Sequence, residues 1–343
     1  MQTALSVQRN MNLKRLNTFG IDAKTSYFAV IHHTQDLVSL LFQDIFHEMP
    51  KLVLGEGSNI LFTQHYDGLI IKNAIKGIQS VAEDEHHIWL KIGAGENWHD
   101  LVTHCVRQGY GGIENLSLIP GTVGAAPIQN IGAYGVELRD VFSELEAFNL
   151  KDHTIRTFHK EDCQFGYRES IFKNIYKNQF IILSVTLRLD KKPKFHIEYS
   201  HIQETLQSMQ IKNLSIQAIS DAVIQIRRSK LPDPKELGNA GSFFKNPLIP
   251  YTHFSKLQKT FPAIPFFPTE DVSSIKIPAA WLIEQCGWKG KRFGDIGVYE
   301  KQALILVNYN AGNGAEILEL ARNIQQSVQD KFNVQLIPEV NLI

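Results

Sequence analysis

The sequence predicts an α+β fold with more than one domain, and three observations support this. The chain has 343 residues, 43% apolar and 20% charged, which is typical of a globular protein with separate hydrophobic cores. Its first third carries short alternating apolar runs broken by glycine, whereas helical apolar stripes dominate later. Pro232 and Pro234 then interrupt the pattern, because each removes a backbone donor and disfavours helix before it. We expect a domain boundary there.

Charge and cysteine content exclude several classes of protein. Lys plus Arg and Asp plus Glu each total 35, so no net charge favours nucleic acid or an anionic membrane. The three cysteines lack CxxC spacing, which argues against a disulfide framework or a zinc site and fits a reducing compartment. The first ten residues lack the apolar core of a signal peptide, and no run approaches the roughly 18 apolar residues of a membrane span. We expect a cytoplasmic protein.

Individual elements follow from the spacing of apolar residues. Short strands are predicted at 52–54, 60–62, 69–71 and 88–92. Apolar residues at 98, 101, 102, 105 and 106 then predict a helix that ends at Gly109. His99, His104 and Cys105 on this helix could suggest a metal site, but solvated histidines and a core cysteine fit the stripe better. Further on we expect a strand at 180–189, helices at 216–226, 278–286 and 317–328, and a strand at 303–307.

The first glycine-rich segment is Gly55-Glu56-Gly57-Ser58-Asn59. This pair of glycines, like the pair at 93 and 95, lacks the third glycine of a dinucleotide-binding fingerprint. Its backbone N–H groups, with the Ser58 hydroxyl and the Asn59 amide, could still hold a diphosphate. A tight hairpin turn between two strands is the alternative.

The second glycine-rich segment runs from 119 to 135. Small residues are so dense here that the segment predicts neither a good helix nor a core strand, which favours close backbone approach to a planar or phosphorylated ligand. Gln129 and Asn130 offer amides that could read the edge of a heterocycle. A long buried crossover loop is the alternative.

Two further clusters carry chemistry. Arg168 follows Tyr167 in a glycine-containing turn, and its planar fork suits a carboxylate, although a plain surface turn is the alternative. Ser242 lies between a glycine and two phenylalanines in a polar loop. It is not in the Gly-x-Ser-x-Gly elbow of a nucleophile, which leaves roles as proton donor or ligand hydrogen-bonder.

Seven motifs in order resemble the UDP-N-acetylenolpyruvoylglucosamine reductase family, flavoenzymes of peptidoglycan precursor synthesis. The resemblance covers nearly the whole chain, and the long 119–135 segment together with Tyr199 is similar to the type I branch. The stretch 251–268, rich in Phe and Pro, has no counterpart that we can place. The motifs are Asn17-Thr18-Phe19-Gly20, Gly55 to Asn59, 119–135, Phe165-Gly166-Tyr167-Arg168, Leu231-Pro232-Asp233-Pro234, Ala240 to Pro247 and Ile337-Pro338-Glu339-Val340.

The resemblance implies a fold and a reaction. The fold would be α+β, with a two-part FAD-binding region (PCMH/vanillyl-alcohol-oxidase-like) at 1–75 and 76–225, the latter joined by a C-terminal strand at 333–343, and a smaller substrate domain at 226–332. The reaction would reduce the enol ether of enolpyruvyl-UDP-GlcNAc to UDP-N-acetylmuramate, with non-covalent FAD carrying hydride from NADPH. A monomer with a UDP-sugar as its partner is expected.

The resemblance also implies site residues. Arg168 and Glu339 would flank the substrate carboxylate, and Ser242 would protonate C2. An ionised Glu339 would repel the developing charge, so we expect it to be protonated or to orient Arg168 or a water. The implied cofactor-binding residues are Gly55, Gly57, Ser58, Asn59, Pro120, Gly121, Gly124, Ala125, Gln129, Asn130, Gly132, Tyr134 and Tyr167. The implied substrate-binding residues are Tyr199, Lys230, Asn246 and Gln302.

Two rival functions stay open at this stage. A flavin oxidase of the same architecture could act on an alcohol or a sugar, and a nucleotide-binding regulatory module would bind without turnover. Reduction of a bound flavin by NADPH would exclude the module. Fast reoxidation by the enolpyruvyl sugar would exclude the oxidase.

Overall fold

The computed structural model describes residues 5–269 and 271–343, and these divide into two compact units. Unit 1 comprises residues 5–11, 25–56 and 67–229. Unit 2 comprises Asn12–Lys24, Gly57–Tyr66 and the described part of Lys230–Ile343. Each unit is therefore assembled from three stretches of chain.

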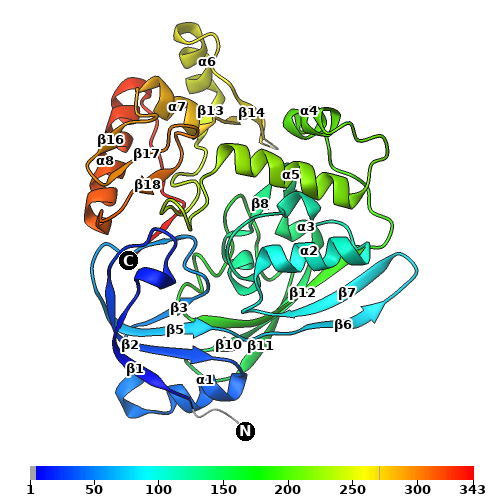
Figure 1. Cartoon of the computed structure of the whole chain (residues 1–343), viewed down its shortest axis with the longest axis vertical. Helices are drawn as coiled ribbons and strands as arrows, with labels where there is room; N and C mark the ends of the chain where they lie inside the picture. The colour runs from blue at the N-terminus through cyan, green and yellow to red at the C-terminus, as the bar shows by residue number, and fades with distance from the viewer. Residues whose placement is uncertain (1–4, 270) are drawn as a thin grey trace. The chain divides into compact units, whose positions relative to one another are not determined.

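The first sheet of unit 1 has four strands, and helical segments pack against it (Figure 1). Its strand order is β1-β2-β5-β3, with β3 parallel to β5. Leu37 and Leu40 of helix α1 (Thr34–Leu41) and Phe46 of the short helix η2 (Asp44–Phe46) are buried in the core that includes this sheet. The strands are β1 (Val7–Asn12), β2 (Lys24–Ile31), β3 (Lys51–Leu54) and β5 (Tyr66–Asn73).

The second sheet of unit 1 has five antiparallel strands in the order β11-β10-β12-β7-β6. The central strand β12 is buried along most of its length, with Val185 paired to Ile92 of β7. Figure 1 shows β6 and β7 as a long hairpin. The strands are β6 (Ile78–Glu83), β7 (His87–Gly93), β10 (Phe142–Asn149), β11 (Ile155–His159) and β12 (Phe180–Asp190).

Helices complete unit 1. Helix α2 (Trp98–Gln108) begins at Asn97, whose side chain accepts a hydrogen bond from Asp100 N, and ends at the left-handed Gly109. Its apolar face packs into the core of the second sheet. Helix α4 (Ser200–Ser208) and helix α5 (Ile216–Lys230) pack on each other through a separate apolar cluster. The smaller elements are η3 (Glu114–Leu116), η4 (Val123–Gln129), β8 (Gly132–Ala133), β9 (Val136–Glu137) and α3 (Leu138–Val141).

Within its described residues, unit 2 combines short strands with three α-helices and the short 3₁₀ helix η1. Helix α8 (Gly314–Phe332) has a capping box between Asn313 and Glu316 and packs against α7 (Ala279–Gln285). Three small sheets, β13-β15-β14, β16-β17-β18 and β19-β4, accompany them. The remaining elements are η1 (Lys14–Leu16), β4 (Ile60–Leu61), β13 (Leu248–Pro250), α6 (Tyr251–Thr260), β14 (Phe267–Pro268), β15 (Ser274–Lys276), β16 (Arg292–Phe293), β17 (Ile296–Val298), β18 (Leu306–Asn308) and β19 (Asn341–Leu342).

Most predicted elements are confirmed, and two differ. The strand expected at 303–307 lies later, at β18, because Ile305 N donates to Gln302 O and makes a turn at its predicted start. The C-terminal strand was expected to join 76–225. That expectation is wrong, because β19 pairs in parallel with β4 inside unit 2, Asn341 opposite Ile60. The stretch 251–268 folds as α6 and β14 with Phe254 and Ile264 buried.

Two further expectations concern the membrane and the thiols. None of the helices in the described chain is both long and apolar enough to cross a membrane. The three cysteines are free thiols, and burial raises the pKa of Cys105 and of Cys163 to about 12. Cys105 and Cys163 are therefore protonated core thiols at neutral pH, whereas Cys286 is only half-buried.

Candidate functional site

The first glycine-rich segment is not a hairpin turn. Strand β3 before it pairs with β5, and strand β4 after it pairs with β19, so the two flanking strands lie in different sheets. Gly55 and Glu56 of this segment belong to unit 1. Sequence reasoning missed Glu56, whose side chain binds two other segments of that unit. Its carboxylate accepts from Gly121 N at 3.0 Å and from Asn97 Nδ2 at 2.6 Å. Glu56 thereby ties the first glycine-rich segment to the second.

Gly55 has a steric reason to be glycine. A Cβ at this position would lie 2.5 Å from Thr122 Oγ1. Its carbonyl accepts from Lys72 Nζ at 2.9 Å, and burial lowers the pKa of Lys72 while Glu56 opposes that shift. The approach at Gly55 is therefore between two protein segments.

In unit 2 the continuation of this segment holds the C-terminus. Asn59 Nδ2 donates to Glu339 O at 3.3 Å, and Asn59 O accepts from Asn341 N at 3.1 Å and Asn341 Nδ2 at 2.9 Å. The structure thus brings Asn59, expected at the cofactor, beside Glu339, expected at the substrate.

The second glycine-rich segment forms the 3₁₀ helix η4, where sequence reasoning expected irregular backbone. Three of its expected cofactor-binding positions use their N–H groups internally. Gly121 N donates to Glu56, Gly124 N to Ala94 O and Ala125 N to Thr122 O. At these positions a ligand would make van der Waals contacts with the backbone, because the N–H groups already donate to protein acceptors.

Asn130 corrects one expectation. It is completely buried, and its amide joins three neighbours: Nδ2 donates to Glu137 Oε2 at 2.8 Å and to Gly166 O at 3.1 Å, and Oδ1 accepts from Arg139 N at 3.0 Å. Because both of its donor hydrogens are used inside unit 1 and the side chain is buried, the amide has no hydrogen left to donate to a heterocycle. It fixes the end of η4 and the turn before Arg168.

Arg168 sits in a constrained turn. Its φ of +56° is in the left-handed region, which residues other than glycine adopt at a cost of roughly 1 kcal/mol. Nη2 donates to Gly132 O at 2.7 Å, and its guanidinium lies 5.6 Å from the centre of the Tyr167 ring. A Cβ on Gly132 would lie 3.1 Å from Arg168 Nη1, so glycine leaves room for the guanidinium.

A second arginine, Arg227 of α5, lies near the first and was missed by sequence reasoning. Burial lowers its pKa, which Tyr134 opposes through charge and a hydrogen bond, while Arg168 lowers it further. Burial raises the pKa of the Tyr134 hydroxyl, because burial disfavours the charged form of this group as it does that of Arg227. Arg227 Nε also donates to Leu118 O at 3.3 Å. Its position on a helix with no motif around it gave no signal. Arg168, Arg227 and Tyr134 form a positive, hydrogen-bonding cluster on unit 1.

In unit 2, backbone pairing places Ser242 beside the segment that carries Glu339. Phe243 N donates to Leu304 O at 2.8 Å, and Glu339 N donates to Phe243 O at 2.8 Å. Phe243 is fully buried, whereas Ser242 is exposed and Glu339 half-buried. Asn239, also missed by sequence reasoning, holds the loop because its Oδ1 accepts from Gly241 N at 2.9 Å.

The expected substrate-binding residues have different settings. Asn246 Oδ1 accepts from Ala279 N at 2.9 Å, so it caps the start of α7. Gln302 Oε1 accepts from Leu304 N at 3.4 Å, next to the Phe243 pairing. Lys230 ends α5, and Tyr199 is 40% exposed with its ring 6.0 Å from that of Tyr134.

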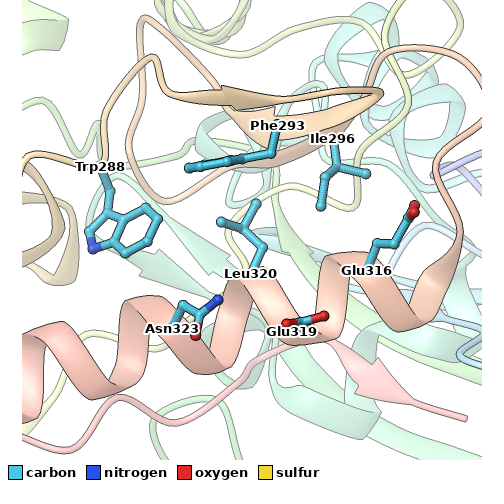
Figure 2. Close-up of a pocket in the computed structure, with 7 residues that line it drawn as sticks. All are labelled: Trp288, Phe293, Ile296, Glu316, Glu319, Leu320 and Asn323. Atoms are coloured by element: carbon cyan, nitrogen blue, oxygen red, sulfur yellow. The ribbon is translucent and has the colours of Figure 1, made fainter.

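Two other features contain none of the expected site residues. His99 Nδ1 accepts from Leu118 N at 3.0 Å, and burial lowers its pKa. The described residues contain no group of three or more His, Cys, Asp or Glu that could hold a metal ion. A groove of about 280 Å³ between α8 and the β16–β17 hairpin contains none of the expected site residues (Figure 2). Its lining is Trp288, Phe293, Ile296, Glu316, Glu319, Leu320 and Asn323.

Comparisons with known proteins decide the family. The profile of an FAD binding domain matches residues 25–158, and that of the UDP-N-acetylenolpyruvoylglucosamine reductase C-terminal domain matches residues 233–343. The UDP-N-acetylenolpyruvoylglucosamine reductase of Amoebophilus asiaticus is 52% identical over 99% of this chain and 100% of its own. The chain belongs to the UDP-N-acetylenolpyruvoylglucosamine reductase family. The expected FAD-dependent reductase class is thereby confirmed.

Further relatives agree. The reductase of Flavobacterium johnsoniae is 45% identical over 99% of this chain and 100% of its own. The crystal structure of the reductase from Thermus caldophilus superposes with a TM-score of 0.68 at 24% identity, covering 98% of this chain and 99% of that one. That likeness confirms the expected α+β fold, and the profile match at residues 25–158 confirms its FAD-binding region.

Proposed function

We propose that the chain reduces enolpyruvyl-UDP-GlcNAc to UDP-N-acetylmuramate, with Arg168, Ser242 and Glu339 as its catalytic residues. Family membership supports the reaction. The observation that carries the assignment of residues is the pairing of Glu339 N with Phe243 O, because it sets the expected proton donor and the expected carboxylate on adjacent segments.

The residues of unit 1 fit FAD by the chemistry of their donors. The flavin and its diphosphate present oxygen acceptors, and the cluster of Arg168, Arg227 and Tyr134 supplies cationic and hydroxyl donors in partly buried surroundings. We propose that 119–135 and Tyr167 contact the cofactor, with Gly55 at its first glycine-rich segment. When bound, FAD supplies the hydride that NADPH has delivered.

Arg168 stabilises the charge that develops on the substrate. Addition of hydride to C3 of the enolpyruvyl group leaves negative charge at C2, which spreads into the adjacent carboxylate. A guanidinium held by Gly132 O presents a fixed positive fork to that carboxylate. Its attraction strengthens as the charge grows, which lowers the barrier.

Ser242 delivers the proton to C2. Ser242 is exposed, while Phe243 after it pairs through its backbone and Gly241 N before it donates to the Asn239 side chain, so the hydroxyl can meet a substrate without rearrangement of the loop. A serine hydroxyl is a weak acid, but the carbanion-like C2 is a strong base, so the transfer runs downhill. Glu339 acts by orienting Arg168 or a water beside the substrate carboxylate.

The remaining assignments concern the UDP-sugar and the setting. Lys230 suits the diphosphate by charge, Tyr199 offers an exposed ring, and Gln302 and Asn246 offer amides. Asn246 would bind through its amide nitrogen, because its oxygen caps α7. We also propose that the two sheets of unit 1 form separate subdomains, that the protein is a monomer and that it is located in the cytoplasm.

A spectroscopic titration tests the proposed function. The purified protein is expected to be yellow, to lose its flavin absorbance with NADPH, and to regain it slowly in air but quickly when the enolpyruvyl sugar is added. Flavin released by acid or heat shows that it is not covalently bound. Rapid reoxidation by oxygen alone, unaffected by the sugar, would instead indicate an oxidase.

A further inference from the structure

The turn η3 is a rigid, buried point in unit 1. Glu114, Leu116 and Ser117 are at most 1% exposed. Trp98 Nε1 donates to Leu116 O at 3.1 Å, which anchors the turn to α2. The hydroxyls of Ser117 and Ser220 lie 2.8 Å apart, which anchors it to α5. Two helices therefore fix this turn independently.

Asn115 extends from this turn toward two other segments. It is 1% exposed, and its Nδ2 donates to Tyr134 O at 2.9 Å and to His196 O at 2.8 Å. Both amide protons are thus used, and the planar carboxamide sets the two carbonyls at a fixed separation. Tyr134 closes the second glycine-rich segment, and His196 lies three residues before Tyr199.

The segments that Asn115 joins need such a tie. Tyr134 has a φ of +49°, a conformation that a tyrosine adopts only when its surroundings hold it. The residues from 193 to 198 lie outside any helix or strand, so the approach to Tyr199 has no ladder to support it. The rings of Tyr134 and Tyr199 nevertheless meet edge to face at 6.0 Å.

Asn115 acts through its two donors. Within the described residues its Oδ1 is buried and makes no hydrogen bond, so the acceptor side of the amide contributes nothing to the contact. A leucine of similar shape would leave the carbonyls of Tyr134 and His196 without this donor. The function of the amide is the placement of these two carbonyls.

We propose that Asn115 is a positioning residue for the UDP-sugar. It sets the spacing of the Tyr134 and Tyr199 rings by holding their backbone segments to η3. This inference rests on the proposed function, in which Tyr199 contacts the substrate. Asn115 itself touches neither substrate nor cofactor.

The test compares Asn115→Leu and Asn115→Ser with Asn73→Leu in the FAD-loaded enzyme. Asn73 is a matched control, because it is 6% exposed and its Nδ2 donates to Ile182 O at 2.8 Å, away from both tyrosines in the contacts it makes. For Asn115→Leu we expect the KM for the enolpyruvyl sugar to rise about tenfold while kcat and FAD content stay within about twofold. Asn115→Ser, which keeps one donor, should be intermediate.

Deuterium exchange separates the tie from the chemistry. The amides at 131–135 and 194–199 should exchange faster in Asn115→Leu, and their exchange should be unchanged in Asn73→Leu. Unaltered exchange there, or an equal rise in KM for the control, overturns the positioning role while leaving the proposed function intact. If amides exchange faster in Asn115→Leu but the wild-type protein does not turn over the enolpyruvyl sugar, Asn115 does hold these segments together. The proposed function is then overturned instead.

Discussion

Arg168 in unit 1 and Ser242 in unit 2 are held by different means. Side chains support Arg168: Asn130 braces the turn before it, and its own guanidinium binds Gly132 O. Backbone pairing supports Ser242, through Phe243 N on one side and Phe243 O on the other. Substitution at Ser242 should therefore remove chemistry alone, whereas substitution at Arg168 removes chemistry and a structural contact together.

The largest effect is expected for Ser242→Ala. Loss of the proton donor should slow turnover by about 10²–10⁴-fold, while reduction of FAD by NADPH continues at nearly the normal rate, because that half-reaction needs no proton at C2. The midpoint of thermal unfolding should match wild type, since the backbone ladder remains. Stopped-flow absorbance of each half-reaction measures the split.

Two companion variants sharpen that result. Ser242→Cys, a better acid of similar size, should recover part of the rate. Ser208→Ala, an exposed serine on α4, should change neither half-reaction. Equal slowing of both half-reactions in Ser242→Ala would assign Ser242 to ligand binding or loop structure.

Arg168→Ala should rank second. Removing a donor to a developing oxyanion typically costs roughly 2.7–4 kcal/mol, a hundredfold to a thousandfold in kcat. Unlike Ser242→Ala, it should also lower the free energy of unfolding by about 1 kcal/mol, because Gly132 O loses its donor. Steady-state kinetics and denaturant unfolding check both parts, with the half-exposed Arg156→Ala of β11 as the control. If Arg168→Ala loses FAD but the molecules that keep FAD turn over normally, Arg168 has only a structural role in its turn.

Asn130→Gly removes the amide that holds the turn before Arg168 and leaves a residue that can adopt the same backbone conformation. Glycine tolerates the φ of +43° at this position but leaves Glu137, Gly166 O and Arg139 N without their amide partner. We expect the free energy of unfolding to fall by about 1–3 kcal/mol, with a smaller loss of kcat than in Arg168→Ala. An unchanged denaturation midpoint would show that the brace is dispensable.

The smallest effect depends on pH. Burial raises the pKa of Glu114 above its ordinary 4.5, so the folded chain binds this proton more tightly than the unfolded chain. The stabilisation from that proton is complete below about pH 4.5 and is lost as the pH rises through the raised value. Glu114→Gln stays neutral, so its unfolding temperature relative to wild type should increase from pH 5 to pH 8. A difference that stays constant with pH would contradict this.

Sequence reasoning predicted the elements whose cause is local. The stripe of α2 and its end at Gly109 follow from apolar spacing and a left-handed glycine, and both are confirmed. The hairpin alternative at Gly55 failed because the pairing of β3 and β4 depends on distant strands. The contacts of Glu56, Asn115 and Arg227 were invisible for the same reason. Each joins segments far apart in sequence, and no local spacing encodes such a contact.

Family motifs located the candidate residues but not how they are supported. Asn130 lies inside a recognised motif, yet its amide proved to be structural because the partners that use it come from two other turns. Arg168 and Ser242 keep their proposed roles as predictions for the experiments above. Their surroundings, in contrast, depend on contacts that form only in the folded chain.

The parallel pairing of β19 with β4 constrains the order of events during synthesis. Asn341 and Leu342 are synthesised long after Ile60 and Leu61, which need them as strand partners. Unit 1 is made before them, because it ends at Ser229. The pairing that joins the early and late stretches of unit 2 therefore cannot form until Leu342 has been synthesised, and a chain that stops before Asn341 would lose it.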